Sequence, residues 1–212
     1  MRRLLLATAI AGLWASGAIA APITGTWTVN VYNFNAGGSS ANADASLTNL
    51  TAHTGSLIDS LTYTGDINFN LASGGTNTIA AFFASAPGGL ISSETTPGAL
   101  NVTMSTGTFQ TTTLLDFLQS GSTPAGAGSV IHDDGVTVMQ GLATLLLSPT
   151  PTVPITSTFT SPGGPLRFIY SGANGLPEVL QASITPAPEP VSIVLLGTGL
   201  VGLGLVRARK RA

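Results

Sequence analysis

The chain has 212 residues, which is room for one ordinary domain with terminal signals, since domains usually run to roughly 100–200 residues. Charged residues are only 8% of it and cysteine is absent, so disulfides, thiolate zinc sites and cysteine nucleophiles are excluded. Residues 21–186 contain one cation, Arg167, and eight acidic residues, so this body carries a net negative charge. Such a body should repel phosphate backbones, so we expect no nucleic-acid partner.

The first 20 residues have the order of a secretory signal peptide. Two arginines are followed by an apolar run over residues 4–14, and the small residues Ala18 and Ala20 come next with one residue between them. We therefore expect a signal helix over 1–20, which signal peptidase cleaves after Ala20 because its pocket accepts only small side chains at these two positions. An uncleaved membrane anchor is the alternative, but the apolar run is shorter than the ~20 residues that a span needs.

The body, residues 21–184, has the pattern of short strands separated by turns. Apolar side chains alternate over 24–31 and 61–71, which is the period of half-buried strands. Gly, Pro, Asn or Asp separates nearly all of the shorter candidate strands, which are 100–106, 136–140, 143–147, 155–159, 166–170 and 179–184. The segments that read as loops are 35–49, 76–97 and 114–128, with a helical turn near 80–83. Many short strands at this spacing predict an all-β fold, an antiparallel β-sandwich.

One stretch of the body stands out, "VIHDDGVTVMQG" from residue 130 to 141. In it a predicted strand runs into Asp133, Asp134 and Gly135 before the next strand begins. Asp-Gly is a common tight-turn dipeptide, so a simple hairpin turn is one interpretation. A later segment, "LRFIYSGANGLPEVL" (166–180), gives a strand that ends in an aromatic residue and then a loop that contains Asn and Gly.

Together these two segments resemble the second half of the protective-antigen lectin-like β-sandwich found in toxin subunits and flocculin adhesins, over about residues 129–184. In the adhesin members, two consecutive aspartates joined by a cis peptide bind calcium with an asparagine of the later loop, and the ion binds sugar hydroxyls. The resemblance implies a β-sandwich of the lectin-like or jelly-roll type, and a calcium site formed by Asp133, Asp134 and Asn174. Calcium takes about six to eight oxygen ligands, and neighbouring carboxylates suit it.

The sequence offers little for catalysis. It has no G-x-S-x-G motif, and His53 and His132 lack both a recognisable nucleophile context and a metal-ligand spacing such as H-E-x-x-H. We therefore expect both to be ordinary surface or strand-end histidines, and the protein not to be an enzyme. An exported hydrolase is the alternative, and it requires one of these histidines within hydrogen-bond reach of a serine or threonine hydroxyl.

The C-terminal glycines at 197, 199 and 202 formally match the G-x-G-x-x-G dinucleotide fingerprint. A nucleotide site needs an acidic residue about 20 residues later, whereas only ten residues follow Gly202 and none of them is acidic. Instead, an extended Pro-rich linker over 185–190 leads into the apolar run 191–206, which predicts a transmembrane helix. By the positive-inside rule we expect the basic tail 207–212 to stay cytoplasmic.

The order Pro-Glu-Pro, apolar span and basic cluster at the extreme C-terminus resembles the PEP-CTERM sorting signal of exported bacterial proteins. The matching residues are Pro188, Glu189, Pro190, Arg207, Arg209, Lys210 and Arg211. The resemblance implies recognition by a membrane-embedded exosortase, a Gram-negative host that makes exopolysaccharide, and delivery across the inner membrane to the cell surface or matrix. A plain C-terminal membrane anchor is the alternative.

We therefore expect an exported, noncatalytic β-sandwich with a structural or adhesive role in a polysaccharide-rich matrix. Its processing partners would be signal peptidase and exosortase, its C-terminal helix would hold it transiently in the inner membrane, and extracellular polysaccharide is the expected ligand. A calcium-dependent carbohydrate-binding module is the first alternative to this function, and an exported hydrolase is the second.

Overall fold

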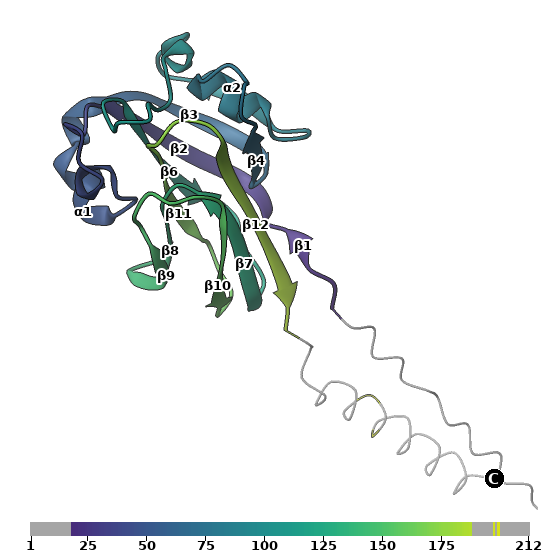
Figure 1. The fold of residues 1–212 in the computed structure, drawn as a ribbon. Helices are drawn as coiled ribbons and strands as arrows, with labels where there is room; N and C mark the ends of the chain where they lie inside the picture. Colours follow the sequence, from purple (N-terminus) through teal and green to yellow (C-terminus); the bar gives the residue numbers. More distant parts are fainter. Residues whose placement is uncertain (1–17, 188–196, 198, 200–212) are drawn as a thin grey trace, which may run out of the picture. The chain divides into compact units, whose positions relative to one another are not determined.

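The computed structural model describes residues 18–187 together with Gly197 and Gly199 (Figure 1). Residues 20–187 form one compact unit, and every residue of its hydrophobic core comes from within it. Ala18 and Ala20 are exposed and lie outside regular structure. Three predicted segments lie outside the described residues: residues 1–17 of the signal peptide, the sorting residues, and the predicted transmembrane helix except for Gly197 and Gly199. None of the described helices is long and apolar enough to cross a membrane.

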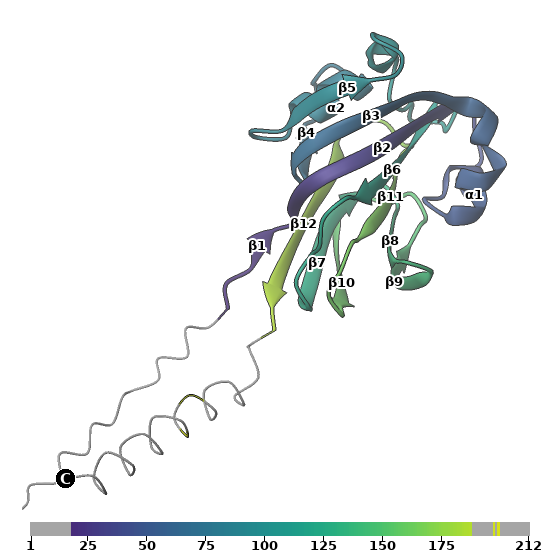
Figure 2. The ribbon, with the colours of Figure 1, turned by 180° about the vertical axis from the view of Figure 1, so that it is seen from behind.

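Within residues 18–187, twelve strands form two antiparallel sheets, as Figures 1 and 2 show from opposite sides. The five-stranded sheet has the order β1 (Ala21–Pro22), β12 (Glu178–Pro186), β7 (Gly126–Asp133) and β10 (Ile155–Ser161), and β4 (Asn68–Leu71) also pairs with β12. The seven-stranded sheet has the order β5 (Leu90–Glu94), β3 (Leu57–Asp66), β2 (Thr24–Phe34), β6 (Thr112–Gln119), β11 (Arg167–Gly172), β8 (Val136–Gln140) and β9 (Ala143–Ser148). The predicted all-β, antiparallel fold class is confirmed.

The core is a cluster of aromatic rings contributed by both sheets. Alternation along β2 buries Trp27 and leaves its neighbours Thr26 and Thr28 exposed. The Trp27 ring meets Phe117 of β6 and Phe168 of β11 edge to face, with ring centroids 6.3 and 5.7 Å apart. This packing of large apolar side chains supplies the main driving force for folding.

The helix α2 (Ile79–Ala84) covers one end of this core. Its N-terminus is capped by Thr78, whose side chain accepts a hydrogen bond from the backbone N–H of Ala81. The buried face of the helix places the Phe82 ring 4.6 Å from Phe69 and 5.5 Å from Tyr170, stacked on both. The predicted helical turn near 80–83 is therefore confirmed, and it links the core to the strand that carries Tyr170.

The alternating segments were predicted well, with one difference. The segment 61–71 is two strands, because the chain passes from β3 of one sheet to β4 of the other at Ile67. Ile67 donates its N–H to the carbonyl of Ile23 at 2.9 Å and accepts from Ala182 at 2.8 Å. The predicted linker also begins later than expected, since Thr185 and Pro186 continue β12 and pair with Ala127 and Gly126.

Other expectations about loops and strands were wrong. The expected loop 114–128 contains most of β6 and the start of β7, because β6 is buried on both faces and so lacks the alternation of a half-buried strand. The expected strand 100–106 is instead the end of a 3₁₀ turn (Ala99–Asn101) and irregular chain. The expected loop 76–97 holds β5 in addition to the predicted helical turn, and the expected loop 35–49 holds a 3₁₀ turn (Ala41–Ala43) and the start of α1 (Leu47–Ala52).

Candidate functional site

The segment Asp133-Asp134-Gly135 connects the two sheets. It leaves β7 of the five-stranded sheet and enters β8 of the seven-stranded sheet, and these two strands do not pair with each other. The hairpin interpretation is therefore wrong. The peptide bond between Asp133 and Asp134 is cis. A Cβ at Gly135 would lie 1.8 Å from the carbonyl oxygen of Pro149, so only glycine fits where this connection crosses the neighbouring loop.

Asp134 joins this aspartate turn, defined as residues 133–135, to the loop that follows β11. Its Oδ2 accepts hydrogen bonds from the backbone N–H groups of Ala173 and Asn174, at 2.7 and 2.8 Å. The other oxygen, Oδ1, is buried and makes no hydrogen bond of good geometry with the described residues, although the backbone amide of Thr152 lies close enough to Asp134 to lower its pKa, and the whole residue is 1% exposed. The structure thus brings together the three residues of the predicted calcium site, with the Asn174 side chain at the surface.

Both carboxyl groups of the turn are harder to ionise than ordinary aspartates. Burial and, to a smaller extent, the charge of Asp134 together raise the pKa of Asp133 to about 7. Burial also raises the pKa of Asp134 to about 6, although the backbone amides of Ala173, Asn174 and Thr152 oppose the shift. A bound cation would offset this cost, because it would stabilise the charged form of both groups.

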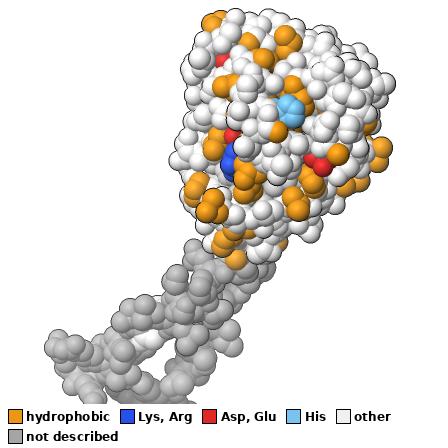
Figure 3. Space-filling view, turned by 90° about the vertical axis from the view of Figure 1, so that its left-hand side faces the viewer, with side chains coloured by type: hydrophobic (Ala, Val, Ile, Leu, Met, Phe, Trp, Pro, Cys, Tyr) orange, Lys and Arg blue, Asp and Glu red, His pale blue; other side chains and the backbone are white. Residues whose placement is uncertain are grey.

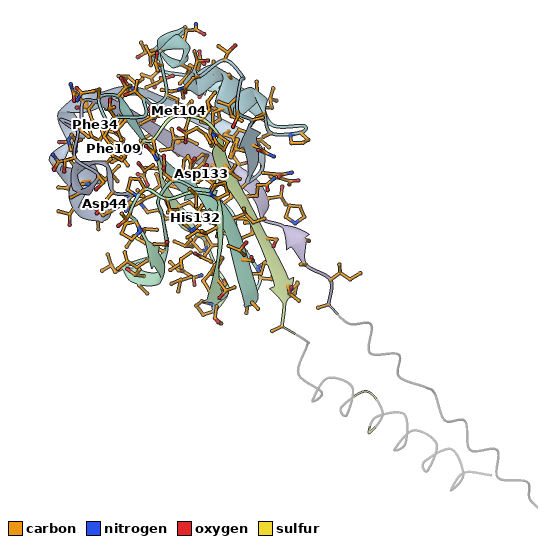
Figure 4. The ribbon with its side chains drawn as sticks, in the orientation of Figure 1. Phe34, Asp44, Met104, Phe109, His132 and Asp133 are labelled. Carbon is orange, nitrogen blue, oxygen red and sulfur yellow. The ribbon has the colours of Figure 1, made fainter. Side chains whose placement is uncertain are left out.

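The backbone carbonyls of the two aspartates are also held in place. His132, at the end of β7, donates from Nδ1 to the carbonyl of Asp134 at 2.6 Å, and the hydroxyl of Tyr170 donates to the carbonyl of Asp133. Figure 4 shows His132 and Asp133 side by side at this end of β7, where both are labelled. The turn is therefore fixed by buried hydrogen bonds before any ligand binds.

The residues that fix the turn include three that were not identified from the sequence. Glu178, the first residue of β12, is fully buried and hydrogen-bonds to Ser105 and to Tyr170. Ser105 precedes β6 by several residues, so no local spacing relates these three side chains. The one available signal was a single acidic residue that directly precedes an apolar strand.

The aspartate turn offers a cation two buried carboxylates, those of Asp133 and Asp134. Among residues 18–187, no group of three or more His, Asp or Glu side chains lies close enough to share a metal ion. A site here would need amide or carbonyl oxygens and water beside the Asp133 and Asp134 carboxylates, which is the mixed oxygen set that calcium accepts. The unpartnered Oδ1 of Asp134 gives such an ion a buried ligand. The residues present therefore fit calcium.

The two histidines differ in their surroundings. His53 follows α1, where it is half-buried and stacks on Phe34 with ring centroids 3.7 Å apart, so it is an ordinary packing residue. His132, in contrast, lies near the end of β7, as the strand-end expectation had it, but its side chain is fully buried and not at the surface. Its Nε2 lies 3.0 Å from the hydroxyl of Ser157 on β10.

The His132–Ser157 pair meets the distance requirement of the hydrolase alternative but not its other requirements. Because Nδ1 donates to a carbonyl, a neutral His132 accepts at Nε2 from the serine hydroxyl, and burial lowers the pKa of His132. A fully buried ring gives a substrate no access, and Nδ1 is bonded to a backbone carbonyl where a hydrolase triad has a carboxylate. The pair therefore supports the turn.

The described surface also carries little positive charge. Arg167, its single cation, forms a two-point ion pair with the buried Asp116, at 2.6 and 3.1 Å. Asp116 also accepts from the side chain of Asn30. In Figure 3 the single blue patch on the described part of this face lies beside a red one, and the further red patches on this face lie apart from them. The body therefore has no free cationic site for an anion among residues 18–187.

No family model matches the chain, and no curated protein matches it. Solved structures with a similar fold include two PA14 domains. The first, the PA14 sugar-binding domain from an RTX adhesin, is 15% identical, with 76% of this chain and 88% of that chain covered and a TM-score of 0.48. The second, the PA14 domain of the MpAFP antifreeze protein, is 14% identical, with 77% and 84% covered and a TM-score of 0.50. The second likeness shows a PA14-like fold, which is a lectin-like β fold, and it concerns the fold alone.

Proposed function

We propose that this protein is an exported, noncatalytic adhesive module that binds calcium at the aspartate turn and sugar hydroxyls through the ion. The observation that carries the proposal is the pair of adjacent buried carboxylates, one of which has an oxygen without a hydrogen-bond partner in the described structure. Such a group normally costs stability, so it is retained where it serves a ligand.

The carboxylates of Asp133 and Asp134 and the side-chain oxygen of Asn174 would hold the ion. When bound, calcium supplies open coordination positions that hydroxyl oxygens can fill. The protein's own part is to keep the turn in place. Asp134 fixes the loop of Asn174 through two backbone N–H groups, and His132 fixes the Asp134 carbonyl. Both sides of the site are therefore set by the fold.

The charge of the body favours hydroxyl recognition over direct recognition of anions. Eight acidic residues and one paired arginine leave no cation to meet a phosphate or sulfate group. A neutral sugar with adjacent hydroxyls needs no such partner, because its oxygens can bind the ion directly. We therefore expect the ligand to be a polysaccharide whose sugars present adjacent hydroxyls.

Retention on sugar-coated beads tests this function. The unit of residues 20–187 is passed over beads that carry mannose or galactose, in calcium and then in a chelator. We expect retention in calcium and release by the chelator, and no retention of the Asp133→Asn variant. Equal retention with and without calcium would contradict the proposed mechanism, as would equal retention of the variant.

Export and sorting are a separate part of the proposal. The signal sequence with Ala18 and Ala20 and the tail with Pro-Glu-Pro and its basic cluster support signal-peptidase cleavage, transient anchoring in the inner membrane and exosortase processing. The mature mass reports both cleavages at once. Replacing Arg207, Arg209, Lys210 and Arg211 with neutral residues should impair surface delivery and leave the body folded, and unchanged delivery in cell fractions would count against this assignment.

A further inference from the structure

Glu178 is a buried carboxyl group that connects two parts of the proposed site. It is 0% exposed at the start of β12. Its Oε1 accepts a hydrogen bond from the hydroxyl of Ser105, and its Oε2 lies 2.8 Å from the hydroxyl oxygen of Tyr170. None of these three residues belongs to the set that would hold calcium.

Each partner of Glu178 leads to a different side of the site. The Ser105 hydroxyl oxygen accepts the backbone N–H of Gly175 at 3.1 Å, which is the residue after Asn174. The Tyr170 hydroxyl donates to the backbone carbonyl of Asp133. Glu178 therefore stands between the loop of Asn174 and the aspartate turn, one hydrogen-bonded side chain away from each.

Counting hydrogens favours one chemical form of Glu178. The Tyr170 hydroxyl has one hydrogen and lies within hydrogen-bond distance of two oxygens, the Asp133 carbonyl and Glu178 Oε2. A carbonyl only accepts, so when Tyr170 donates to Asp133 the remaining hydrogen bond needs a hydrogen on Glu178. A neutral carboxylic acid at Glu178 satisfies the whole chain, because Ser105 then donates to its Oε1 and its own O–H donates to Tyr170.

The packing around Glu178 accommodates its carboxyl group, and the described residues provide no free cation that could neutralise a charged Glu178. A Cβ at Gly172 would lie 2.8 Å from Glu178 Oε2 and 2.7 Å from the Met104 methyl carbon, so a larger residue at this position of β11 would have to displace the carboxyl group and the methionine side chain. Arg167, the single cation of residues 18–187, is already paired with Asp116. Burial and the nearby aspartates raise the pKa of Glu178 well above its usual value, in agreement with the neutral form.

We propose that Glu178, as a neutral carboxylic acid, is the positioning residue of the site: through Tyr170 and Ser105 it holds the Asp133 carbonyl and the Gly175 N–H at a fixed separation. This inference rests on the proposed calcium site for its function, but its structural part does not. Residues that orient metal ligands from behind typically affect metal affinity by about 10- to 100-fold.

Two substitutions separate the hydrogen bonds of Glu178 from its charge. Glu178→Gln keeps one acceptor and one donor and removes the possibility of ionisation, whereas Glu178→Leu removes both hydrogen bonds at similar volume. We expect the Gln variant to bind calcium as the parent unit does, and the Leu variant to bind about 10- to 100-fold more weakly, in calorimetric titrations of the 20–187 unit with calcium chloride. Amide hydrogen exchange at Gly175 should accelerate in the Leu variant only.

A matched pair of tyrosines provides the control. Tyr63 is also buried, and its hydroxyl donates to the backbone carbonyl of Asp66 at 2.8 Å. Tyr63→Phe therefore removes the same kind of hydrogen bond without touching the Glu178 chain. We expect Tyr170→Phe to weaken calcium binding and Tyr63→Phe to leave it unchanged, which decides the matter if the Leu variant does not fold.

The outcomes of these experiments separate the proposed calcium binding from the proposed positioning role of Glu178. If the parent unit binds no calcium, the proposed function fails, and Gly175 exchange in the Gln and Leu variants still decides the role of Glu178. If the parent binds calcium and the Leu variant does so equally, with unchanged Gly175 exchange, the positioning role is overturned. A Gln variant as impaired as the Leu variant would overturn the neutral form, because it would show that the charged carboxylate is needed.

Discussion

The aromatic centre of the sandwich and the aspartate turn are both buried, but the centre consists of apolar side chains and the turn of acidic ones. The centre joins Trp27, Phe117 and Phe168 by ring contacts and needs few polar partners. The turn places Asp133 and Asp134 beside each other, raises the pKa of both and leaves one carboxylate oxygen without a partner in the described structure. The aromatic centre therefore stabilises the fold, whereas the aspartate turn lowers its stability, as expected of the proposed ligand site.

The largest expected effect lies in the aromatic centre. Replacing Phe117 with alanine removes a fully buried ring that contacts Trp27 and Phe69, and should lower the free energy of unfolding by about 3–5 kcal/mol. Urea unfolding of the 20–187 unit measures this loss. Calcium affinity of the variant that remains folded should be unchanged, and a parallel loss of affinity would show that the two regions are not independent.

A substitution in the turn should have the opposite sign on stability. Asp133→Asn removes a buried group that resists ionisation, so without calcium the variant should be at least as stable as the parent at neutral pH. It also removes a charged ligand, so calcium binding should be lost in the millimolar range. Thermal unfolding with and without calcium chloride measures both effects, and a clearly destabilised variant without calcium would contradict the account of the turn.

The pH dependence of stability should show the same contrast. The folded pKa values of Asp133 and Asp134, about 7 and about 6, lie above ordinary carboxyl values. At pH values between the ordinary carboxyl pKa and these raised values, the folded state therefore binds more protons than the unfolded state. The stabilisation from this pair is fully present below about pH 4 and is lost as pH rises through 6 to 7.

Urea unfolding at several pH values checks this prediction. The 20–187 unit should lose stability over this range in the absence of calcium, and Asp133→Asn should reduce the loss. Saturating calcium should also reduce it, since the ion stabilises the ionised carboxylates. A stability that rises from pH 4 to 7 and does not respond to Asp133→Asn would mean that the pair is not strained by burial.

The smallest effect is expected at Ser157. Replacing it with alanine removes the hydrogen bond to His132 Nε2 and should cost about 0.5–1.5 kcal/mol. Calcium binding should change little, because Nδ1 of His132 still holds the Asp134 carbonyl. An assay with generic ester substrates should find the parent as inactive as the variant, and activity that disappears with Ser157 would revive the hydrolase alternative.

The two regions also differ in how far the sequence could predict them. The alternation around Trp27 identified β2, and the candidate strand 136–140 coincides with β8, because half-buried strands and turn residues leave local signals. The strand β6 left no such signal, since both of its faces are buried. The strand β6 is stabilised by packing against neighbouring parts of the fold on both faces, and the local sequence pattern does not contain that information.

In the turn, sequence reasoning reached the residues that are adjacent in the chain and missed those that are not. Asp133 and Asp134 were found as a dipeptide, with Asn174 added by resemblance. Glu178 was missed because its partners are 73 and 8 residues away and its role exists only in three dimensions. His132 was taken for an ordinary strand-end residue, because one sequence does not show that its ring is buried against Ser157.

Calorimetric titration of the 20–187 unit with calcium chloride, run beside its Asp133→Asn variant at pH 7.5, tests the central claim most directly. We expect one saturable binding event in the parent at millimolar or lower calcium, accompanied by proton release, and none in the variant. No binding heat in the parent at millimolar calcium, or the same binding in both proteins, would contradict a calcium site at the aspartate turn.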